Sequence, residues 1–156
     1  MIKMKTKLLS SMLLLFCAWS INAQTKKIDI SKLKIGAISA LYAKSIDIEK
    51  NDTIFYVYLG FQNAKFKSIS DMKSVFLSKD EETKNLLKDL KSALPEIGTK
   101  QSIAWKKDLY GITLYDFSNG LYFYENPSKG SGYTVIQKND VEKLISWLES
   151  FEFGKG

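Results

Sequence analysis

The spacing of the apolar residues changes from two to a helical period twice along this chain, and that alternation constrains the fold most. Residues 35–77 and residues 102–136 carry apolar side chains mainly at alternate positions, which is typical of β-strands. Each of these stretches is followed by a segment with apolar residues at helical spacing. The helical apolar positions are Leu86, Leu87, Leu90 and Leu94 in the first segment and Leu144, Ile145, Leu148 and Phe151 in the second.

Short signals predict where the two helices begin and where the first one ends. Ser78 with Glu81 three residues later matches a capping box, and Asn139 with Glu142 matches the same pattern. Pro95 follows the first apolar series and predicts the end of that helix. Both segments are therefore expected to be amphipathic helices.

Strands followed by a helix, twice, predict the α+β class. We expect a single domain with one antiparallel sheet of about six to eight strands and both helices packed on one face. The segment 53–61 is apolar at both parities, so it is expected to be a central strand covered on both faces. The order of elements is similar to the tandem strand-and-helix architectures of TATA-binding or Whirly-type proteins, although no residue motif of those families is present.

The two halves also agree in their spacing. A shift of 58 positions places Leu86, Leu87 and Leu90 on Leu144, Ile145 and Leu148. This match indicates an internal duplication with half-repeats at 35–95 and 100–153. A chance match between two capped amphipathic helices is the alternative.

The first 23 residues have the anatomy of a secretory signal peptide. A basic start with Lys3, Lys5 and Lys7 precedes an apolar run from Leu8 to Ile21, and Ala23 provides a small residue for cleavage. Export to the periplasm or the outside of the cell, with cleavage after Ala23, is therefore the expectation.

Two alternatives to cleavage after residue 23 remain open. A retained membrane anchor needs about 20 predominantly apolar residues, whereas this run is shorter and is interrupted by serines. Lipidation at Cys17 is the other alternative, but Phe16 stands where a lipoprotein has a small residue. After cleavage, residues 24–34 are expected to form a polar leader and residues 35–156 the globular domain.

The charge of the mature chain argues against nucleic acid as a partner. Cleavage removes three lysines and no acid, which lowers the formal net charge from +6 to +3. The chain contains no arginine, the residue that dominates bidentate recognition of phosphate and guanine. We expect no nucleic-acid binding, and no membrane span once the signal peptide is removed.

Beyond the predicted signal peptide the sequence contains neither cysteine nor histidine. This composition excludes disulfides, thiolate or imidazole zinc sites, cysteine nucleophiles and Ser-His-Asp triads. We expect no cofactor. The glycine-containing loop 126–132 lacks the Gly-Lys-Ser/Thr ending of a phosphate-binding loop. Catalysis would have to rest on carboxylates, lysine or tyrosine.

The most suggestive candidate site is an excess of aromatic residues on the predicted strands, together with the loop 126–132. Tyrosine and tryptophan are enriched at binding interfaces. The alternative is that these rings are covered by the helices. The candidate partner-binding residues are Tyr56, Tyr58, Trp105, Tyr110, Tyr122, Tyr124 and the loop residue Lys129.

The turn near residue 51 carries a candidate modification site. Asn51 begins an Asn-Asp-Thr sequon for N-glycosylation, and Thr53 lies in an Asp-Thr-apolar sequence that resembles an O-glycosylation acceptor of Bacteroidetes. Either modification would place this turn on the surface.

These observations favour an exported, non-enzymatic binding module that holds a protein or a glycan. A periplasmic immunity or inhibitor protein that neutralises a toxin or a hydrolase is the first alternative. A hydrolase that uses carboxylates or lysine is the more distant one, because it would need two acids converging in a cleft.

Overall fold

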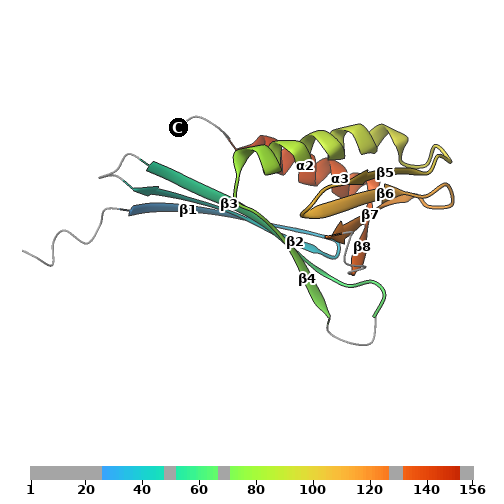
Figure 1. The fold of residues 1–156 in the computed structure, drawn as a ribbon, viewed down its shortest axis with the longest axis horizontal. Helices are drawn as coiled ribbons and strands as arrows, with labels where there is room; N and C mark the ends of the chain where they lie inside the picture. Colours follow the sequence, from blue (N-terminus) through green and yellow to red (C-terminus); the bar gives the residue numbers. More distant parts are fainter. Residues whose placement is uncertain (1–25, 48–51, 67–70, 127–131, 152–156) are drawn as a thin grey trace, which may run out of the picture.

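The strands of the chain form two antiparallel sheets, each followed in sequence by a helix (Figure 1). The computed structural model describes residues 26–47, 52–66, 71–126 and 132–151. Within these residues the order is four strands and a helix, then four strands and a second helix. The expected α+β class, with antiparallel strands and two helices, is therefore confirmed.

Sheet A is a four-stranded meander. Its strands are β1 (Lys26–Ile35), β2 (Ile38–Asp47), β3 (Asp52–Gln62) and β4 (Met72–Leu77). Each strand pairs with the next one in sequence, so β1 and β4 are the edges. Leu33, Ala40, Leu59 and Val75 lie side by side across the four strands. This row belongs to the inner face of the sheet, which packs on the core.

Sheet B repeats the same meander with shorter strands. These are β5 (Ile103–Lys106), β6 (Tyr110–Leu114), β7 (Gly120–Glu125) and β8 (Tyr133–Gln137). Ile112 and Phe123 are paired on neighbouring strands and are fully buried. The inner face of sheet B therefore contributes to the core as the inner face of sheet A does.

The expectation of one sheet of about six to eight strands is wrong. The eight described strands divide into two sheets of four, and β4 does not pair with β5. The helix α2 (Asp80–Ala93) and the 3-10 turn η1 (Leu94–Glu96) lie between them in sequence. A period of two indicates a strand with one buried face, but it does not say which strand lies next to it.

Both helices lie on the same side of the molecule (Figure 1). The helix α3 (Lys138–Glu149) contacts α2 and strands of both sheets, and α2 likewise contacts β4 and β6. As predicted, the first helix ends just before Pro95, which lies in η1. The two helices thus cover the inner faces of sheet A and sheet B together.

The predicted caps are each displaced. At the start of α2 the backbone N–H groups of Ser78 and Lys79 donate to Glu82 Oε2 at 2.9 and 3.1 Å. Glu82, and not Glu81, is therefore the acid that reaches back to the helix start. The second helix begins before the expected cap, so Asn139 and Glu142 lie inside α3.

One apolar core joins the two halves of the chain. Leu86 and Leu90 of α2, and Leu144 and Leu148 of α3, are all fully buried. The rings of Phe61 on β3 and Phe123 on β7 meet edge to face with their centroids 5.7 Å apart. The inner faces of both sheets therefore pack on each other as well as on the helices.

A polar link also joins the two sheets. Asn63, which follows β3 and is 2% exposed, accepts a hydrogen bond from the backbone N–H of Tyr133 at 3.2 Å through Oδ1. Its Nδ2 donates to Asp71 Oδ2 at 2.8 Å. The backbone N–H of Ala64 donates to the carbonyl oxygen of Tyr133 at 2.7 Å. These bonds fix the end of β3 against the start of β8.

The N-terminal part of the fold differs from the expected polar leader. Most of residues 24–34 belongs to β1, which pairs with β2 from Lys26 to Ile35. Backbone hydrogen bonds to β2 hold this strand, so its polar side chains do not prevent it from forming. The predicted signal peptide, residues 1–23, lies outside the described residues, and both export and an internal duplication stay predictions.

Candidate functional site: the outer face of sheet A

The face of sheet A that points away from the helices, called here the outer face, is rich in exposed apolar side chains. Six of the nine exposed large apolar side chains among the described residues lie on it. They come from β1, β3 and β4, and they are Ile28, Ile30, Ile54, Tyr58, Met72 and Phe76. Exposed apolar side chains gathered on one face mark interaction sites on folded proteins.

The strand β3 shows most clearly that this face is unusual. Val57, Leu59 and Phe61 point to the core and are fully buried. The alternate residues are equally apolar, yet Ile54 is 61% exposed and Tyr58 is 39% exposed. The expectation that this strand is central is confirmed by its pairing with β2 and β4. The expectation that both of its faces are covered is wrong for the residues that the structure describes.

Two aromatic contacts order the middle of the outer face. The rings of Tyr56 and Phe76 lie 5.3 Å apart between centroids. Tyr58 lies against Gly60, where an added Cβ would come within 2.9 Å of the tyrosine Cε1. Glycine at position 60 therefore makes room for the Tyr58 ring on its own strand. The cross-strand neighbours of Tyr58 are Leu41 on β2 and Phe76 on β4.

The charged side chains that the structure describes on the outer face are both basic. Lys32 and Lys34 lie on β1 at alternate positions and are both exposed. Among the outward side chains that the structure describes on this sheet there is no carboxylate. The two lysines line a shallow groove of about 420 Å³, whose other lining residues include Ser39, Leu41 and Tyr58.

The structure places the predicted aromatic residues on two outward sheet faces and in the core. Tyr56 and Tyr58 lie on the outer face of sheet A, as just described. Tyr122 and Tyr124 lie on the outward face of sheet B, opposite in parity to the buried Leu121 and Phe123. The predicted single aromatic face is therefore divided between two sheets.

The tyrosines of sheet B form a cluster of their own. Tyr115 and Tyr124 share a hydrogen bond of 3.1 Å between their hydroxyl groups, and Tyr122 meets Tyr115 edge to face. Tyr133 packs on both Tyr122 and Tyr124. Burial and the hydrogen bond with Tyr115 raise the pKa of the Tyr124 hydroxyl well above its usual value. These rings pack mainly on one another, and each is half-buried.

Trp105 and Tyr110 face the other way, toward the core. Tyr110 is 2% exposed and its hydroxyl donates to Asp89 Oδ2 of α2 at 2.8 Å. Trp105 is half-buried and packs against the core. For these two residues the structure therefore agrees with the alternative, in which the rings are covered.

The remaining predicted positions are Lys129, Asn51 and Thr53. Lys129 and Asn51 lie outside the described residues. Thr53 lies near the start of β3 and is half-buried. Glycosylation at this turn stays a prediction.

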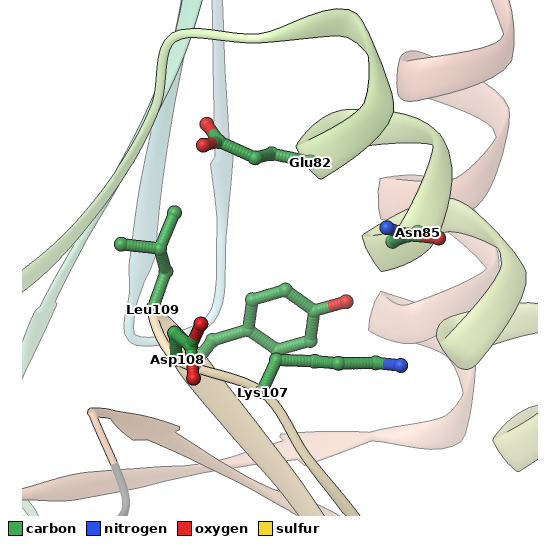
Figure 2. Close-up of a pocket in the computed structure, with 6 residues that line it drawn as sticks. Glu82, Asn85, Lys107, Asp108 and Leu109 are labelled. Atoms are coloured by element: carbon green, nitrogen blue, oxygen red, sulfur yellow. The ribbon is translucent and has the colours of Figure 1, made fainter.

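A separate polar pocket of about 270 Å³ lies between α2 and the turn from β5 to β6 (Figure 2). In Figure 2, Glu82 and Asn85 project from α2, and Asp108 and Leu109 project from the turn. Glu82 Oε2 already accepts the two backbone hydrogen bonds at the helix start. The hydroxyl of Tyr110, which forms part of the wall, is bonded to Asp89.

Two of the groups around this pocket, Glu82 and Tyr110, hold the fold together. Burial and the hydrogen bond to Asp89 raise the pKa of the Tyr110 hydroxyl far above its usual value, so this phenol stays protonated and donates to Asp89 near neutral pH. Asp108 and Lys107 are exposed members of the turn. Glu82 and Tyr110 of this pocket are therefore already hydrogen-bonded within the fold, and the pocket supports binding chemistry less well than the outer face of sheet A.

Across residues 26–47, 52–66, 71–126 and 132–151, no three potential Asp, Glu, Cys or His ligands gather in one place. In the same part of the chain, neither helix has the length and apolar character needed to cross a bilayer.

Sequence reasoning missed five of the six exposed apolar residues of the outer face. Ile28 and Ile30 were assigned to the leader, and Ile54, Met72 and Phe76 were not singled out. The available signal was parity, because Ile54 alternates with the core residues of β3 and Phe76 lies between Val75 and Leu77, which are both buried.

Comparisons with known proteins add no relative from which a function could be transferred. The chain matches no protein-family model, no curated protein and no solved structure.

Proposed function

We propose that this chain is an exported binding module that holds a partner protein on the outer face of sheet A. The observation that carries this proposal is the composition of β3, which is apolar on both faces although the described residues cover only one of them. A central strand with this pattern is normally buried on both sides. A partner on the outer face would complete that burial.

A protein suits this face better than a glycan does. Four of its six exposed apolar side chains are aliphatic, namely Ile28, Ile30, Ile54 and Met72. Aliphatic side chains gain from contact with other apolar surface, whereas sugar rings require polar groups beside a stacking ring. Methionine also adapts its shape to a partner, and such residues are enriched at protein interfaces. An inhibitor of a toxin or hydrolase is one narrower form of this proposal.

The experiment compares variants of the two sheets in the native host. The tagged full chain is crosslinked in living cells and the attached proteins are identified by mass spectrometry. The test variant carries Ile54→Thr and Phe76→Ser on the outer face of sheet A. The control variant carries Phe117→Ser, which removes the most exposed aromatic ring among the described residues, next to Tyr115 of the sheet B cluster.

We expect a protein that is crosslinked by the wild type and the control but is lost from the test variant, with the test variant still folded by circular dichroism. A partner that remains attached to the folded test variant would contradict the proposal. A partner lost only with Phe117→Ser would instead move the site to the tyrosine cluster of sheet B.

A further inference from the structure

The strand β1 is the long free edge of sheet A. It pairs with β2 along all ten of its residues. On its other side no strand lies among the residues that the structure describes (Figure 1). In an antiparallel sheet, half of the backbone groups of an edge strand point away from its neighbour, so β1 offers a row of donors and acceptors to another strand.

This edge is held firmly in place from the inner side. The indole N–H of Trp147 on α3 donates to Ser31 Oγ at 3.1 Å. Ile35 at the end of the strand is buried in the core, and Leu33 packs against it. A preorganised edge loses little conformational entropy when a further strand pairs with it.

The outward side chains of β1 change in character along the strand. Ile28 and Ile30 are 61% and 60% exposed, and they are followed on the same face by Lys32 and Lys34. The two lysines form no ion pair with any residue that the structure describes. The strand therefore presents two apolar positions and then two basic positions at a spacing of two.

We propose that β1 receives an extended segment of the partner protein as a fifth strand of sheet A. Apolar side chains of that segment lie beside Ile28 and Ile30, and acidic side chains lie beside Lys32 and Lys34. Strand addition obtains its affinity from main-chain hydrogen bonds and its selectivity from alternate side chains. This inference rests on the proposed function, because it names how the partner engages the same face.

A second copy of this chain suits the edge less well. A symmetric antiparallel pair of β1 strands that keeps the outer faces aligned places each lysine beside an isoleucine or another lysine. No register of this kind places a lysine beside an acid on the outer face, so the four cations would remain without partners. Lysine on an edge strand is a common device against such self-pairing. An acidic segment provides the carboxylate partners for Lys32 and Lys34 that β1 of a second copy does not.

The test uses labelled peptides and fluorescence anisotropy with the folded chain. Two acidic peptides represent the two strand directions, Thr-Val-Thr-Val-Thr-Glu-Thr-Glu-Thr and Thr-Glu-Thr-Glu-Thr-Val-Thr-Val-Thr. Their controls carry Lys in place of Glu. The charge-reversed variant is Lys32→Glu with Lys34→Glu, and its matched control is Lys88→Glu with Lys106→Glu, two exposed lysines on α2 and β5.

We expect one acidic peptide to bind the wild type about tenfold more tightly than its lysine counterpart. Each cross-strand charge pair contributes only part of the binding free energy that corresponds to a tenfold change in affinity. The charge-reversed variant should prefer the lysine peptide, and the matched control should behave as the wild type. Absence of binding by both acidic peptides at millimolar concentration, or a preference that survives charge reversal, would overturn the inference.

Methylated peptides separate strand addition from simple charge attraction. Methyl groups on alternate backbone nitrogens block one hydrogen-bonding edge of the peptide at a time. We expect one methylated form to bind and the other to fail. Equal binding of both forms, or lysine-dependent binding to vesicles that contain phosphatidylglycerol without binding to any peptide, would overturn strand addition.

The crosslinking experiment distinguishes failure of this inference from failure of the proposed function. If the host partner is lost with Ile54→Thr and Phe76→Ser but is retained by the charge-reversed variant, the outer face binds a partner and β1 is not its edge. If the partner is lost with both variants and retained by both controls, the two proposals stand together.

Discussion

The hydroxyl of Tyr110 on β6 donates a buried hydrogen bond of 2.8 Å to Asp89 Oδ2 on α2. The two residues belong to different halves of the chain, because α2 follows sheet A and β6 belongs to sheet B. Both side chains are almost fully buried, at 2% and 6% exposure. This contact therefore joins a helix of the first half to a strand of the second half through polar groups inside the core.

Removing the donor of this bond should destabilise the fold. Tyr110→Phe leaves the carboxylate of Asp89 buried without that hydrogen bond, which costs about 1–3 kcal/mol in the free energy of unfolding. Urea denaturation followed by tryptophan fluorescence measures the loss. The double variant Tyr110→Phe with Asp89→Leu should lose less than the sum of the two single variants, since no unpaired polar group then remains. Strict additivity would show that the two groups are not coupled.

The same residue should make the protein sensitive to alkali. Burial, and then the hydrogen bond to Asp89, raise the pKa of Tyr110 above its ordinary value of 10.0. The stabilisation that follows from this shift is fully present below about pH 10 and is lost at higher pH, because only the unfolded chain then releases the proton. Urea midpoints between pH 8 and 11.5 should fall less steeply for Tyr110→Phe than for the wild type. Parallel curves would show that this phenol does not contribute.

Gly132 should not tolerate a larger side chain. A Cβ at this position would overlap the Cγ and Nδ2 atoms of Asn63, which is itself buried and bonded to Tyr133 and Asp71. Gly132→Ala should therefore displace Asn63 and cost about 1–3 kcal/mol in stability. Gly98→Ala serves as the comparison, because its Cβ would meet only Asn119 Oδ1 at 3.9 Å and its penalty comes from the positive φ of 88°. Amide exchange at Tyr133 should rise in the Gly132 variant alone.

Substitutions on the two faces of β3 should differ in how much they change the stability of the isolated chain. Leu59→Ala removes a fully buried side chain and should cost about 2–5 kcal/mol. Ile54→Thr changes an exposed side chain on the same strand and should alter the stability of the isolated chain by about 0.5 kcal/mol or less. Thermal and urea unfolding of both variants check this. A large cost for Ile54→Thr in a monomeric sample would mean that the outer face is already covered.

Much of the fold could be predicted from apolar periodicity, but the grouping of strands could not. Leu86 and Leu90, and Leu144 and Leu148, occupy the buried helix positions that their spacing predicted. The separation of β4 from β5 depends on how α2 and η1 cross the molecule, and periodicity within each strand contains no information on that path. The strand β1 was missed because lysines, Asp29 and Ser31 separate its few large apolar side chains, and this composition is typical of a polar leader.

The candidate site was predicted only in part, for a related reason. Tyr56 and Tyr58 were recognised as surface candidates, but Tyr110 was grouped with them although it shares parity with the buried Ile112 and Leu114. Parity along a strand indicates which residues share a face. It does not indicate whether that face meets a helix, another sheet or solvent, and that distinction separates Tyr58 from Tyr110.

The contacts across the midpoint of the chain make the seam between its halves resemble the interface of an obligate dimer. The Phe61–Phe123 contact and the bonds from Asn63 and Asp89 all cross this seam. A chain cut after Gly98 would thus yield two fragments, each with half of an interior and neither able to close it. Such fragments should acquire native structure only on mixing, and the whole protein should unfold as one cooperative unit in spite of its two sheets.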